Sequence, residues 1–193
     1  MRGPQFLNPS GPLWHLNCVL RCLLGEVQVK TPSAVILAAG RGSRLIERTK
    51  GLPKCLLRFG ESSIIEHQVA ALRECGIRNI NAVVGYRASC IQRVLGRSVR
   101  YIHNELFRYT NSLYSLWLAR DCLQNGFILI NGDVLFCPDI LEGLLRSPHS
   151  DAIAVQQKSE FDGEEMKVRL DHDRILAISK TLPHRRAYGE SLG

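Results

Sequence analysis

Five consecutive apolar residues, Ala34 to Ala38, run directly into a loop that contains Gly40 and Gly42. A short apolar run closed by glycines is typical of a strand that is buried on both faces. Such a strand needs helices above and below it, so this feature restricts the chain to an α/β architecture. We expect a globular domain that covers residues 32–193, with residues 1–31 as an N-terminal extension.

Apolar strand patterns alternate with helix patterns along most of the domain. This alternation predicts a three-layer, Rossmann-like, mostly parallel sheet with helices on both faces. Two patterns near the end, joined by a polar tetrapeptide, predict a C-terminal β-hairpin instead. The further strands are expected at 80–85, 99–103, 127–131 and 152–156, the helices at 63–76, 88–95, 111–123 and 138–145, and the hairpin at 166–170 and 175–179.

The net charge of +7 suits a polyanionic ligand, which includes nucleic acid, an anionic membrane and a small phosphorylated molecule. Lys and Arg are scattered along the chain without a long basic run, which favours the small molecule over nucleic acid. The apolar stretch at 13–24 is interrupted by polar residues and is too short to span a membrane. These patterns leave the oligomeric state open.

The seven cysteines include no Cys-x-x-Cys pair and no histidine at zinc-ligand spacing. This arrangement predicts reduced, mostly structural thiols. Such thiols are typical of a cytoplasmic protein.

The strongest functional signal is the segment 37–45, Leu-Ala-Ala-Gly-Arg-Gly-Ser-Arg-Leu, followed by a Pro-Lys pair that ends at Lys54. Gly40 and Gly42 allow the backbone to approach a ligand closely and to direct N–H groups at phosphate oxygens. Arg44 and Lys54 add positive charge for the same phosphates. The segment therefore predicts an anion-binding loop, with a simple strand-to-loop turn as the alternative.

Two commoner phosphate-binding loops do not fit this segment. A dinucleotide-binding fingerprint needs a small residue where Leu45 stands, and it needs an acidic residue after the second strand. A Walker loop needs Gly-Lys followed by Ser or Thr, which the segment lacks. An NAD-dependent dehydrogenase is therefore disfavoured.

Three features occur here in the order seen in a known family: an apolar strand, then Leu-Ala-Ala-Gly-x-Gly-Ser-Arg-Leu, and then Pro-Lys. Over residues 33–193 the chain resembles the nucleoside-triphosphate transferases, which include sugar-1-phosphate nucleotidyltransferases and phosphocholine or phosphonate cytidylyltransferases. The resemblance implies transfer of a nucleotidyl group with release of pyrophosphate, with Arg44 and Lys54 as catalytic residues. It also implies that the nucleotide is bound by Leu37, Ala38, Ala39, Gly40, Gly42 and Ser43.

Asp133 follows the buried strand at 127–131, on the side of the sheet where ligands bind in this architecture. From the residues alone, Asn-Gly-Asp is either a turn or a site for a hard cation. The resemblance implies that Asp133 is a catalytic residue and holds Mg²⁺. It also implies that a second acidic ligand lies beyond residue 193, so that the domain is truncated at its C-terminal end.

Asn111 and Ser112 open the helix at 111–123, in a segment where the resembling enzymes contact the base. The alternative, which is compatible with a base contact, is that Asn111 caps the helix, with Leu113, Leu116 and Trp117 in the core. Further along, the resemblance implies that Lys167 and Lys180 bind the acceptor, although each is also compatible with a solvated strand residue.

The segments 111–116 and 165–168 are more similar to the choline and phosphonate branch than to the sugar branch. We therefore expect CMP transfer from CTP to a small phosphorylated or phosphonate acceptor. In that case Asp162, Glu164 or Glu165 would face a cationic amine, and Trp117 or Tyr188 would cover a quaternary ammonium. The alternatives are a sugar-1-phosphate enzyme that uses UTP or dTTP, and a nucleotide-binding module without turnover.

Overall fold

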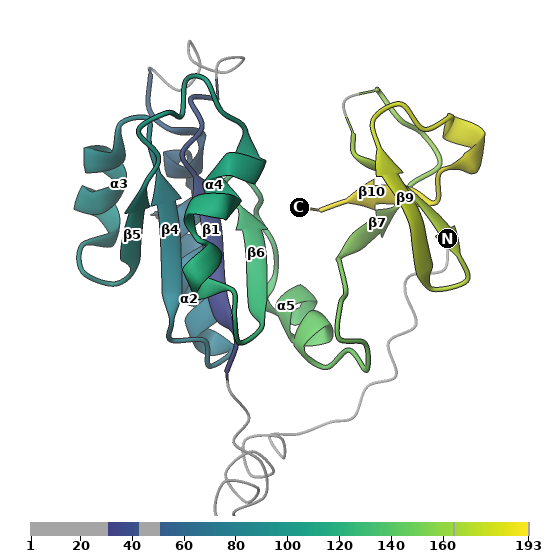
Figure 1. Cartoon of the computed structure of the whole chain (residues 1–193), viewed down its shortest axis with the longest axis horizontal. Helices are drawn as coiled ribbons and strands as arrows, with labels where there is room; N and C mark the ends of the chain where they lie inside the picture. Colours follow the sequence, from purple (N-terminus) through teal and green to yellow (C-terminus); the bar gives the residue numbers. More distant parts are fainter. Residues whose placement is uncertain (1–30, 43–50, 164, 193) are drawn as a thin grey trace, which may run out of the picture. The chain divides into compact units, whose positions relative to one another are not determined.

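The computed structural model describes residues 31–42, 51–163 and 165–192 (Figure 1). Its first part is a parallel four-stranded sheet between layers of helices, which confirms the three-layer Rossmann-like prediction. The strands are β1 (Ser33–Ala38), β4 (Ile80–Val84), β5 (Arg100–His103) and β6 (Phe127–Asn131). The helices are α2 (Ile64–Glu74), α3 (Ala88–Leu95), α4 (Ser112–Leu118) and α5 (Pro138–Leu145), with 3₁₀ turns η2 (Lys54–Leu56) and η3 (Arg120–Cys122) and a short pair of strands, β2 (Arg58–Phe59) and β3 (Ser62–Ser63).

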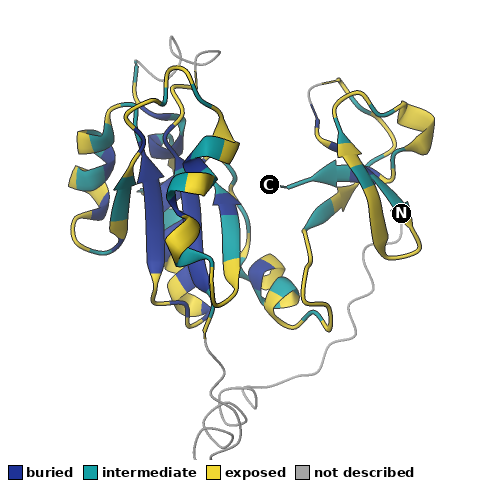
Figure 2. Cartoon of the chain, in the orientation of Figure 1, coloured by how far each residue is buried: buried dark blue, intermediate teal, exposed yellow. Residues whose placement is uncertain are grey.

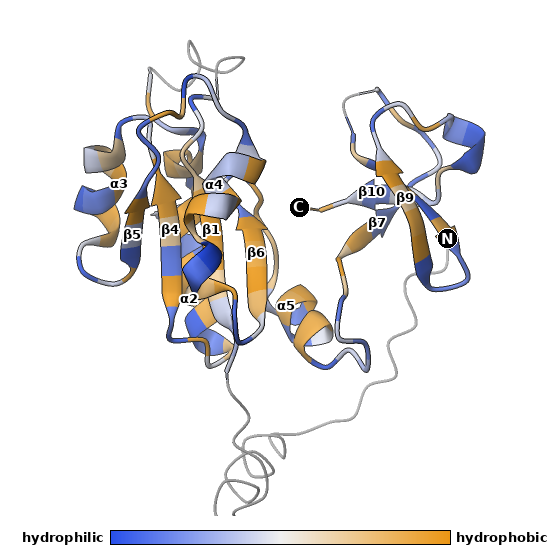
Figure 3. Ribbon diagram, viewed as in Figure 1, coloured by the Kyte–Doolittle hydropathy of each residue, from blue (hydrophilic) through white to orange (hydrophobic). Residues whose placement is uncertain are grey.

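Both faces of β1 are buried, as its unbroken apolar sequence predicts (Figures 2 and 3). Ala34 and Ile36 point to one face, where they belong to a core with residues of α2, α3 and α5. Val35 points to the other face and packs in a smaller core with Ala119, which follows α4. This division follows from the two-residue period of a strand.

Local signals determine where α2 begins and ends. The Glu66 carboxylate accepts hydrogen bonds from the Ser63 backbone N–H at 2.8 Å and from its hydroxyl at 2.6 Å. These contacts occupy groups that the first turn of a helix leaves unpaired. At the other end, Gly76 has a φ of 81°, a left-handed conformation in which glycine avoids the Cβ clash of other residues.

The helix predicted at 111–123 is shorter than expected. It ends at Leu118, and the chain continues as the 3₁₀ turn η3 after Ala119. Ala119 is fully buried, whereas Leu113 and Trp117 are exposed. The expectation that Leu113 and Trp117 form part of the core is wrong, whereas Leu116 is partly buried. The segment packs through Ser115 of α4 and through Ala119, which follows the helix.

The strand order β5-β4-β1-β6 places β6 on the opposite side of β1 from β4 and β5. The chain therefore runs outward from β1 to β5 and then returns across the sheet. The reversal lies between β1 and β6, which pair in parallel from Ser33 with Phe127 to Leu37 with Asn131. In open parallel sheets, ligands bind beyond the carboxyl ends of the strands at such a reversal.

The C-terminal part contains an antiparallel sheet of its own, in the order β7-β10-β8-β9. The predicted hairpin is confirmed as β8 (Lys167–Asp171) and β9 (Arg174–Ser179), which pair antiparallel. A strand of the parallel sheet was expected at 152–156, and this expectation is wrong. β7 (Val155–Gln157) pairs antiparallel with β10 (Gly189–Ser191), and its glutamines are exposed, unlike a strand covered on both faces.

Within the described residues, every helix is too short or too polar to cross a membrane. The cysteines that the structure describes, Cys55, Cys75, Cys90, Cys122 and Cys137, are all free thiols.

Candidate active site

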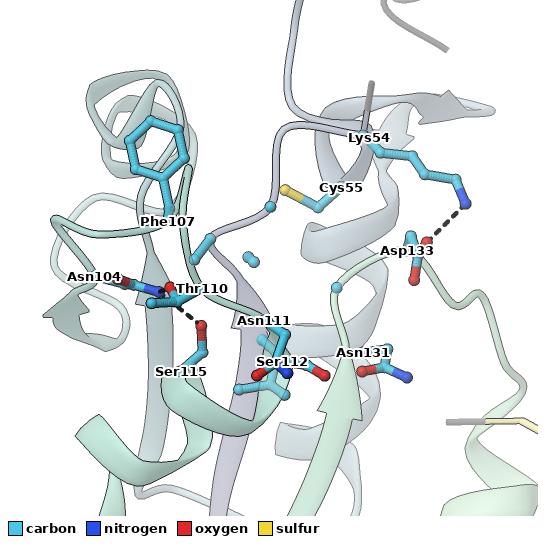
Figure 4. A pocket seen from close by; sticks show the side chains of 16 residues that line it. Lys54, Cys55, Asn104, Phe107, Thr110, Asn111, Ser112, Ser115, Asn131 and Asp133 are labelled. Atoms are coloured by element: carbon cyan, nitrogen blue, oxygen red, sulfur yellow. Dashed lines mark hydrogen bonds and ion pairs between the residues drawn. The ribbon is translucent and has the colours of Figure 1, made fainter. Parts of the chain in front are cut away.

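A pocket of about 260 Å³ lies at the carboxyl ends of β1 and β6, at the point where the strand order reverses (Figure 4). Its lining combines backbone from the glycine-containing segment with polar side chains from the segments that follow β5 and β6. The lining residues are Leu37, Ala38, Ala39, Gly40, Gly42, Lys54, Cys55, Asn104, Phe107, Thr110, Asn111, Ser112, Ser115, Asn131, Gly132 and Asp133.

The glycine-containing segment, residues 37–42, forms one wall of the pocket at the end of β1. Gly42 adopts a φ of 61°, in the left-handed region where a side chain is strained. The Ala39 carbonyl accepts a hydrogen bond from the Tyr86 N–H at 3.0 Å, which ties the segment to the end of β4. Ser43 and Arg44, which the sequence assigns to the nucleotide, lie outside the described residues.

Lys54 and Asp133, predicted separately from two motifs, meet in this pocket. The Lys54 Nζ donates a hydrogen bond to the Asp133 Oδ2 at 2.7 Å, and the two side chains are 37% and 44% exposed (Figure 4). Ion pairs as exposed as this one contribute only about 0.2 to 1 kcal/mol to stability. Their meeting brings one cation and one carboxylate to the ligand side of the sheet.

Gly132 allows the segment before Asp133 to lie against β1. Its N–H donates to the Leu37 carbonyl at 2.9 Å. A Cβ at this position would lie 2.8 Å from the same carbonyl oxygen and 3.1 Å from the Cβ of Ala38. The close approach of two backbones therefore requires glycine here, and Gly132 joins the site without having been predicted as a site residue.

Asn111 caps α4, because its Oδ1 accepts hydrogen bonds from the backbone N–H groups of Leu113 at 3.1 Å and Tyr114 at 3.3 Å. Asn111 and Ser112 also line the pocket. Capping and a contact with the base are thus compatible. With Oδ1 engaged in the cap, the Asn111 amide nitrogen is the group that the side chain offers to a ligand.

Asn104 joins the end of β5 to the start of α4. Its Nδ2 donates to the Thr110 hydroxyl at 3.1 Å and to the Ser115 hydroxyl at 3.0 Å, and its backbone N–H donates to the Val84 carbonyl at 2.8 Å. Asn104 is 2% exposed. No motif in the sequence marks Asn104, although its place one residue beyond a predicted strand is where ligand-binding residues of parallel sheets occur.

Cys55 lines the pocket next to Lys54 but is not prepared to act as a nucleophile. Burial raises the pKa of its thiol to about 12, and the negative charge of Asp133 adds to the effect. A nucleophilic cysteine requires the thiolate, which a depressed pKa supplies. Cys55 therefore serves as packing in the wall of the pocket.

The predicted acceptor residues, Lys167 and Lys180, do not line this pocket. Lys167 begins β8, where only 2% of it is exposed, and its Nζ lies 5.9 Å from the centre of the Phe161 ring. Lys180 follows β9 and is exposed. The burial of Lys167 does not suit direct contact with an acceptor from solution.

Glu165, expected to face a cationic amine, is already engaged. It accepts hydrogen bonds from the Lys158 Nζ at 2.8 Å and from the backbone N–H groups of Asp162 at 3.1 Å and Gly163 at 3.0 Å. The bond from Lys158 foremost, together with that from the Asp162 N–H, holds the pKa of the Glu165 carboxyl well below its usual range. Glu164 lies outside the described residues.

Trp117 is also engaged, although 53% of it is exposed. The Arg120 guanidinium lies 4.4 Å from the centre of its ring, and Tyr114 stacks on it with the ring centres 5.6 Å apart. Its aromatic surface is therefore shared with protein groups. Tyr188, the other aromatic expected to cover a quaternary ammonium, is 44% exposed.

Comparison with known proteins shows relatives that match part of the chain. The chain is 34% identical over 129 residues to a CMP-5'-(3-aminopropyl)phosphonate synthase from Streptomyces rubellomurinus, and this match covers 64% of the chain and 20% of the relative. It is 33% identical over 117 residues to a choline-phosphate cytidylyltransferase from Streptococcus pneumoniae, covering 60% of the chain and 51% of the relative. The chain thus spans about half the length of the second relative and less of the first.

Solved structures show the same fold. The inositol-1-phosphate CTP transferase from T. maritima superposes with a TM-score of 0.67 at 25% identity, over 86% of this chain and 70% of that protein. The CTP:phosphocholine cytidylyltransferase from Streptococcus pneumoniae gives a TM-score of 0.63 at 25% identity, over 83% and 66%. Residues 34–186 match one domain family, which covers both the parallel sheet and most of the C-terminal sheet. The chain belongs to the family of MobA-like NTP transferase domains.

Proposed function

We propose that this domain transfers CMP from CTP to a small phosphorylated or phosphonate acceptor and releases pyrophosphate. The observation that carries the proposal is the meeting of the glycine-containing segment, Lys54 and Asp133 in one pocket at the reversal of the sheet. Family membership supports nucleotidyl transfer. Relatives named for phosphocholine and phosphonate substrates support the choice of CTP and acceptor.

In the proposed reaction, an anionic oxygen of the acceptor attacks the α-phosphorus of the triphosphate in line. A new P–O bond forms while the bond from the α-phosphorus to the bridging oxygen breaks, and pyrophosphate leaves with that oxygen and its electron pair. No strong general base is needed, because the attacking oxygen already carries negative charge. Catalysis then consists mainly of positioning and of neutralising the charge on the phosphoryl oxygens.

Lys54 supplies a point charge for the phosphates. A phosphate that enters the pocket would replace Asp133 as the partner of the Lys54 ammonium. Asp133 offers one partly exposed carboxylate, and Mg²⁺ in nucleotide sites commonly takes one or two carboxylates together with substrate phosphates. One carboxylate is therefore enough for that cation when substrate phosphates supply further oxygen ligands. Among the described residues, no group of three or more His, Cys, Asp or Glu side chains could hold a metal by itself. Bound there, Mg²⁺ would neutralise charge on the phosphoryl oxygens.

The remaining pocket wall suits the nucleoside. Asn111 and Ser112 place an amide nitrogen and a hydroxyl at the N-terminus of α4, and both groups can donate hydrogen bonds. Cytosine presents acceptors on its O2 and N3 positions, which matches donors on the protein. The pocket volume of about 260 Å³ is slightly below the usual range for small-molecule sites, about 300 to 1,000 Å³.

For the acceptor, the exposed Lys180 is the better candidate of the two predicted lysines, since Lys167 is buried. An ammonium there would pair with the acceptor phosphate or phosphonate. Tyr188 is the aromatic that we propose for a cationic amine, because Trp117 is already covered by Arg120.

The test is a matrix of four nucleoside triphosphates against phosphocholine, 2-aminoethylphosphonate and several sugar-1-phosphates, with pyrophosphate release as the readout. We expect turnover with CTP and one of the two zwitterionic acceptors. Preference for UTP or dTTP with a sugar-1-phosphate would replace the substrates but keep the reaction type. CTP binding by calorimetry in Mg²⁺, with no pyrophosphate from any pair, would identify a nucleotide-binding module instead.

A second experiment tests Asp133. We expect Asp133→Asn to lose Mg²⁺-dependent turnover with only a small change in melting temperature, because an amide keeps the shape of the carboxylate but not its charge. Asp121→Asn is the matched control, since the Asp121 side chain is 81% exposed and lies outside the pocket. Wild-type rate and Mg²⁺ dependence in Asp133→Asn would reduce Asp133 to a turn residue.

A further inference from the structure

Gln68 is a buried polar side chain that contacts the segment carrying Asp133 from a different element. It lies in the middle of α2 and is 1% exposed. Its Nε2 donates to the Asn131 carbonyl at 2.9 Å and to the Val134 carbonyl at 2.6 Å. These two carbonyls flank Gly132 and Asp133, so one amide group holds both ends of the turn.

The same turn is held from the other side by β1. The Gly132 N–H donates to the Leu37 carbonyl at 2.9 Å, and the Val134 N–H donates to the Asn131 carbonyl at 3.2 Å. The backbone around Asp133 is thus fixed by the sheet, by its own turn and by Gln68. The carboxylate of Asp133 contacts Lys54, and Asp133 lines the pocket beside Asn131 and Gly132.

The amide at this position leaves one of its own polar atoms without a hydrogen bond. The Gln68 Oε1 is buried without a hydrogen-bond partner, a state shared among the described side chains only by Asn104 Oδ1 and Arg169 Nε. An apolar side chain would fill the same space without leaving an acceptor unsatisfied. The two hydrogen bonds to the turn are what the amide provides there.

We propose that Gln68 is a positioning residue for the metal and triphosphate site. It acts by holding the turn at 131–134 so that the Asp133 carboxylate faces the pocket. Gln68 does not line the pocket and therefore does not touch the substrates. The inference rests on the proposed function, because it takes Asp133 to be the ligand of the cation.

The test compares the binding of Mn²⁺ in the presence of CTP, followed by electron paramagnetic resonance, in four proteins. Gln68→Met keeps the length of the side chain and removes both donors. We expect it to bind Mn²⁺ about 10- to 100-fold more weakly, as is common when a group that orients a metal ligand is replaced. Asp133→Asn provides the reference for loss of the ligand itself.

The matched control is Asn81→Leu. Asn81 is also a fully buried amide that donates to a backbone carbonyl, that of Ala34 at 3.2 Å, but it lies in β4 away from the pocket. We expect it to lose stability and to keep the Mn²⁺ affinity of the wild type. Equal loss of affinity in Asn81→Leu and Gln68→Met would show a general structural effect and overturn the positioning role.

Two failures are distinguishable. Equal Mn²⁺ affinity in the wild type and Asp133→Asn would contradict the proposed metal site, whatever Gln68 does. A clear loss in Asp133→Asn with wild-type affinity in Gln68→Met would overturn the role of Gln68 alone. If Gln68→Met does not fold, the side-chain amide resonances of Gln68 in the wild type decide: we expect them to shift on adding Mg²⁺ and CTP, and their constancy would refute the inference.

Discussion

The Lys54 ammonium lies 2.7 Å from the Asp133 carboxylate, although 79 positions separate the two residues in the sequence. Lys54 opens the 3₁₀ turn η2, and Asp133 follows β6. The two opposite charges pair with each other in the lining of the pocket. Binding of a triphosphate and a divalent cation would break this ion pair and form two stronger ones. Lys54 would then pair with phosphate, and Asp133 with the metal.

This exchange predicts opposite effects of Lys54→Ala on two ligands. CTP binding should weaken at least about tenfold, because a hydrogen bond to a charged group contributes about 1.5 to 3 kcal/mol. Mn²⁺ binding without nucleotide should strengthen, because the competing ammonium is gone. Calorimetry and electron paramagnetic resonance measure the two affinities. Arg97→Ala, an exposed cation outside the pocket, is the control, and weaker Mn²⁺ binding in Lys54→Ala would contradict the exchange.

Gly132→Ala should lower the free energy of unfolding by about 1 to 3 kcal/mol, the usual effect of overpacking. The new Cβ would lie 2.8 Å from the Leu37 carbonyl oxygen, which already accepts a hydrogen bond from the Gly132 N–H at 2.9 Å. Gly143→Ala is the control, because Gly143 lies in α5 with no atom within 4 Å of the new Cβ. There alanine should stabilise by about 0.5 to 1 kcal/mol. Urea unfolding measures both, and equal shifts would argue against the close approach.

Cys55 should resist alkylation in the folded protein. Burial raises the pKa of its thiol to about 12, so the reactive thiolate is scarce at pH 8. Cys137 is exposed and should react with iodoacetamide under the same conditions. Peptide mass spectrometry separates the two sites. Alkylation of both at the same rate before urea is added would show that the wall of the pocket opens readily.

Glu165 should make stability depend on pH in the acidic range. Its pKa is lowered in the folded state by Lys158 and by two backbone N–H groups, so its contribution is complete above the unfolded pKa of about 4.3. That contribution is lost as pH falls from there toward the folded pKa. Lys158, whose pKa is raised, mainly by its hydrogen bond to Glu165, loses its contribution only in the alkaline range.

Glu165→Gln should therefore flatten the loss of stability between pH 6 and pH 3, measured by urea unfolding. Glu160→Gln makes the same change of charge at an exposed position and serves as the control. An unchanged acid profile in Glu165→Gln would mean that the carboxylate contributes nothing to the C-terminal sheet.

Several elements follow from local sequence signals alone. The predicted bounds of α3 (Ala88–Leu95), β6 (Phe127–Asn131) and α5 (Pro138–Leu145) agree with the structure. Each has a signal within its own residues, such as an unbroken apolar run or a proline in the first helical turn. The glycine-containing loop and Asp133 were likewise predicted from motifs next to strands, and both line the pocket.

Other features depend on residues that are distant in the chain. β7 was predicted as a strand, but its partner β10 begins 32 residues after Gln157, at Gly189, and no local pattern identifies that pairing. Asn104 and Gln68 have no motif of their own. Their roles follow from hydrogen bonds to Ser115 and to the Asn131 and Val134 carbonyls, which only the folded chain brings within reach.

The sequence by itself determined the α/β class, the glycine-containing loop after β1 and the carboxylate after β6, because apolar periodicity and glycine positions act over a few residues. The tertiary structure alone decided that Lys54 meets Asp133, that Glu165 is bound by Lys158, and that Lys167 is buried. These outcomes depend on strand order and on side-chain packing. Strand order and side-chain packing depend on the free energy of contacts between segments that are distant in the chain. A local sequence pattern does not contain that information.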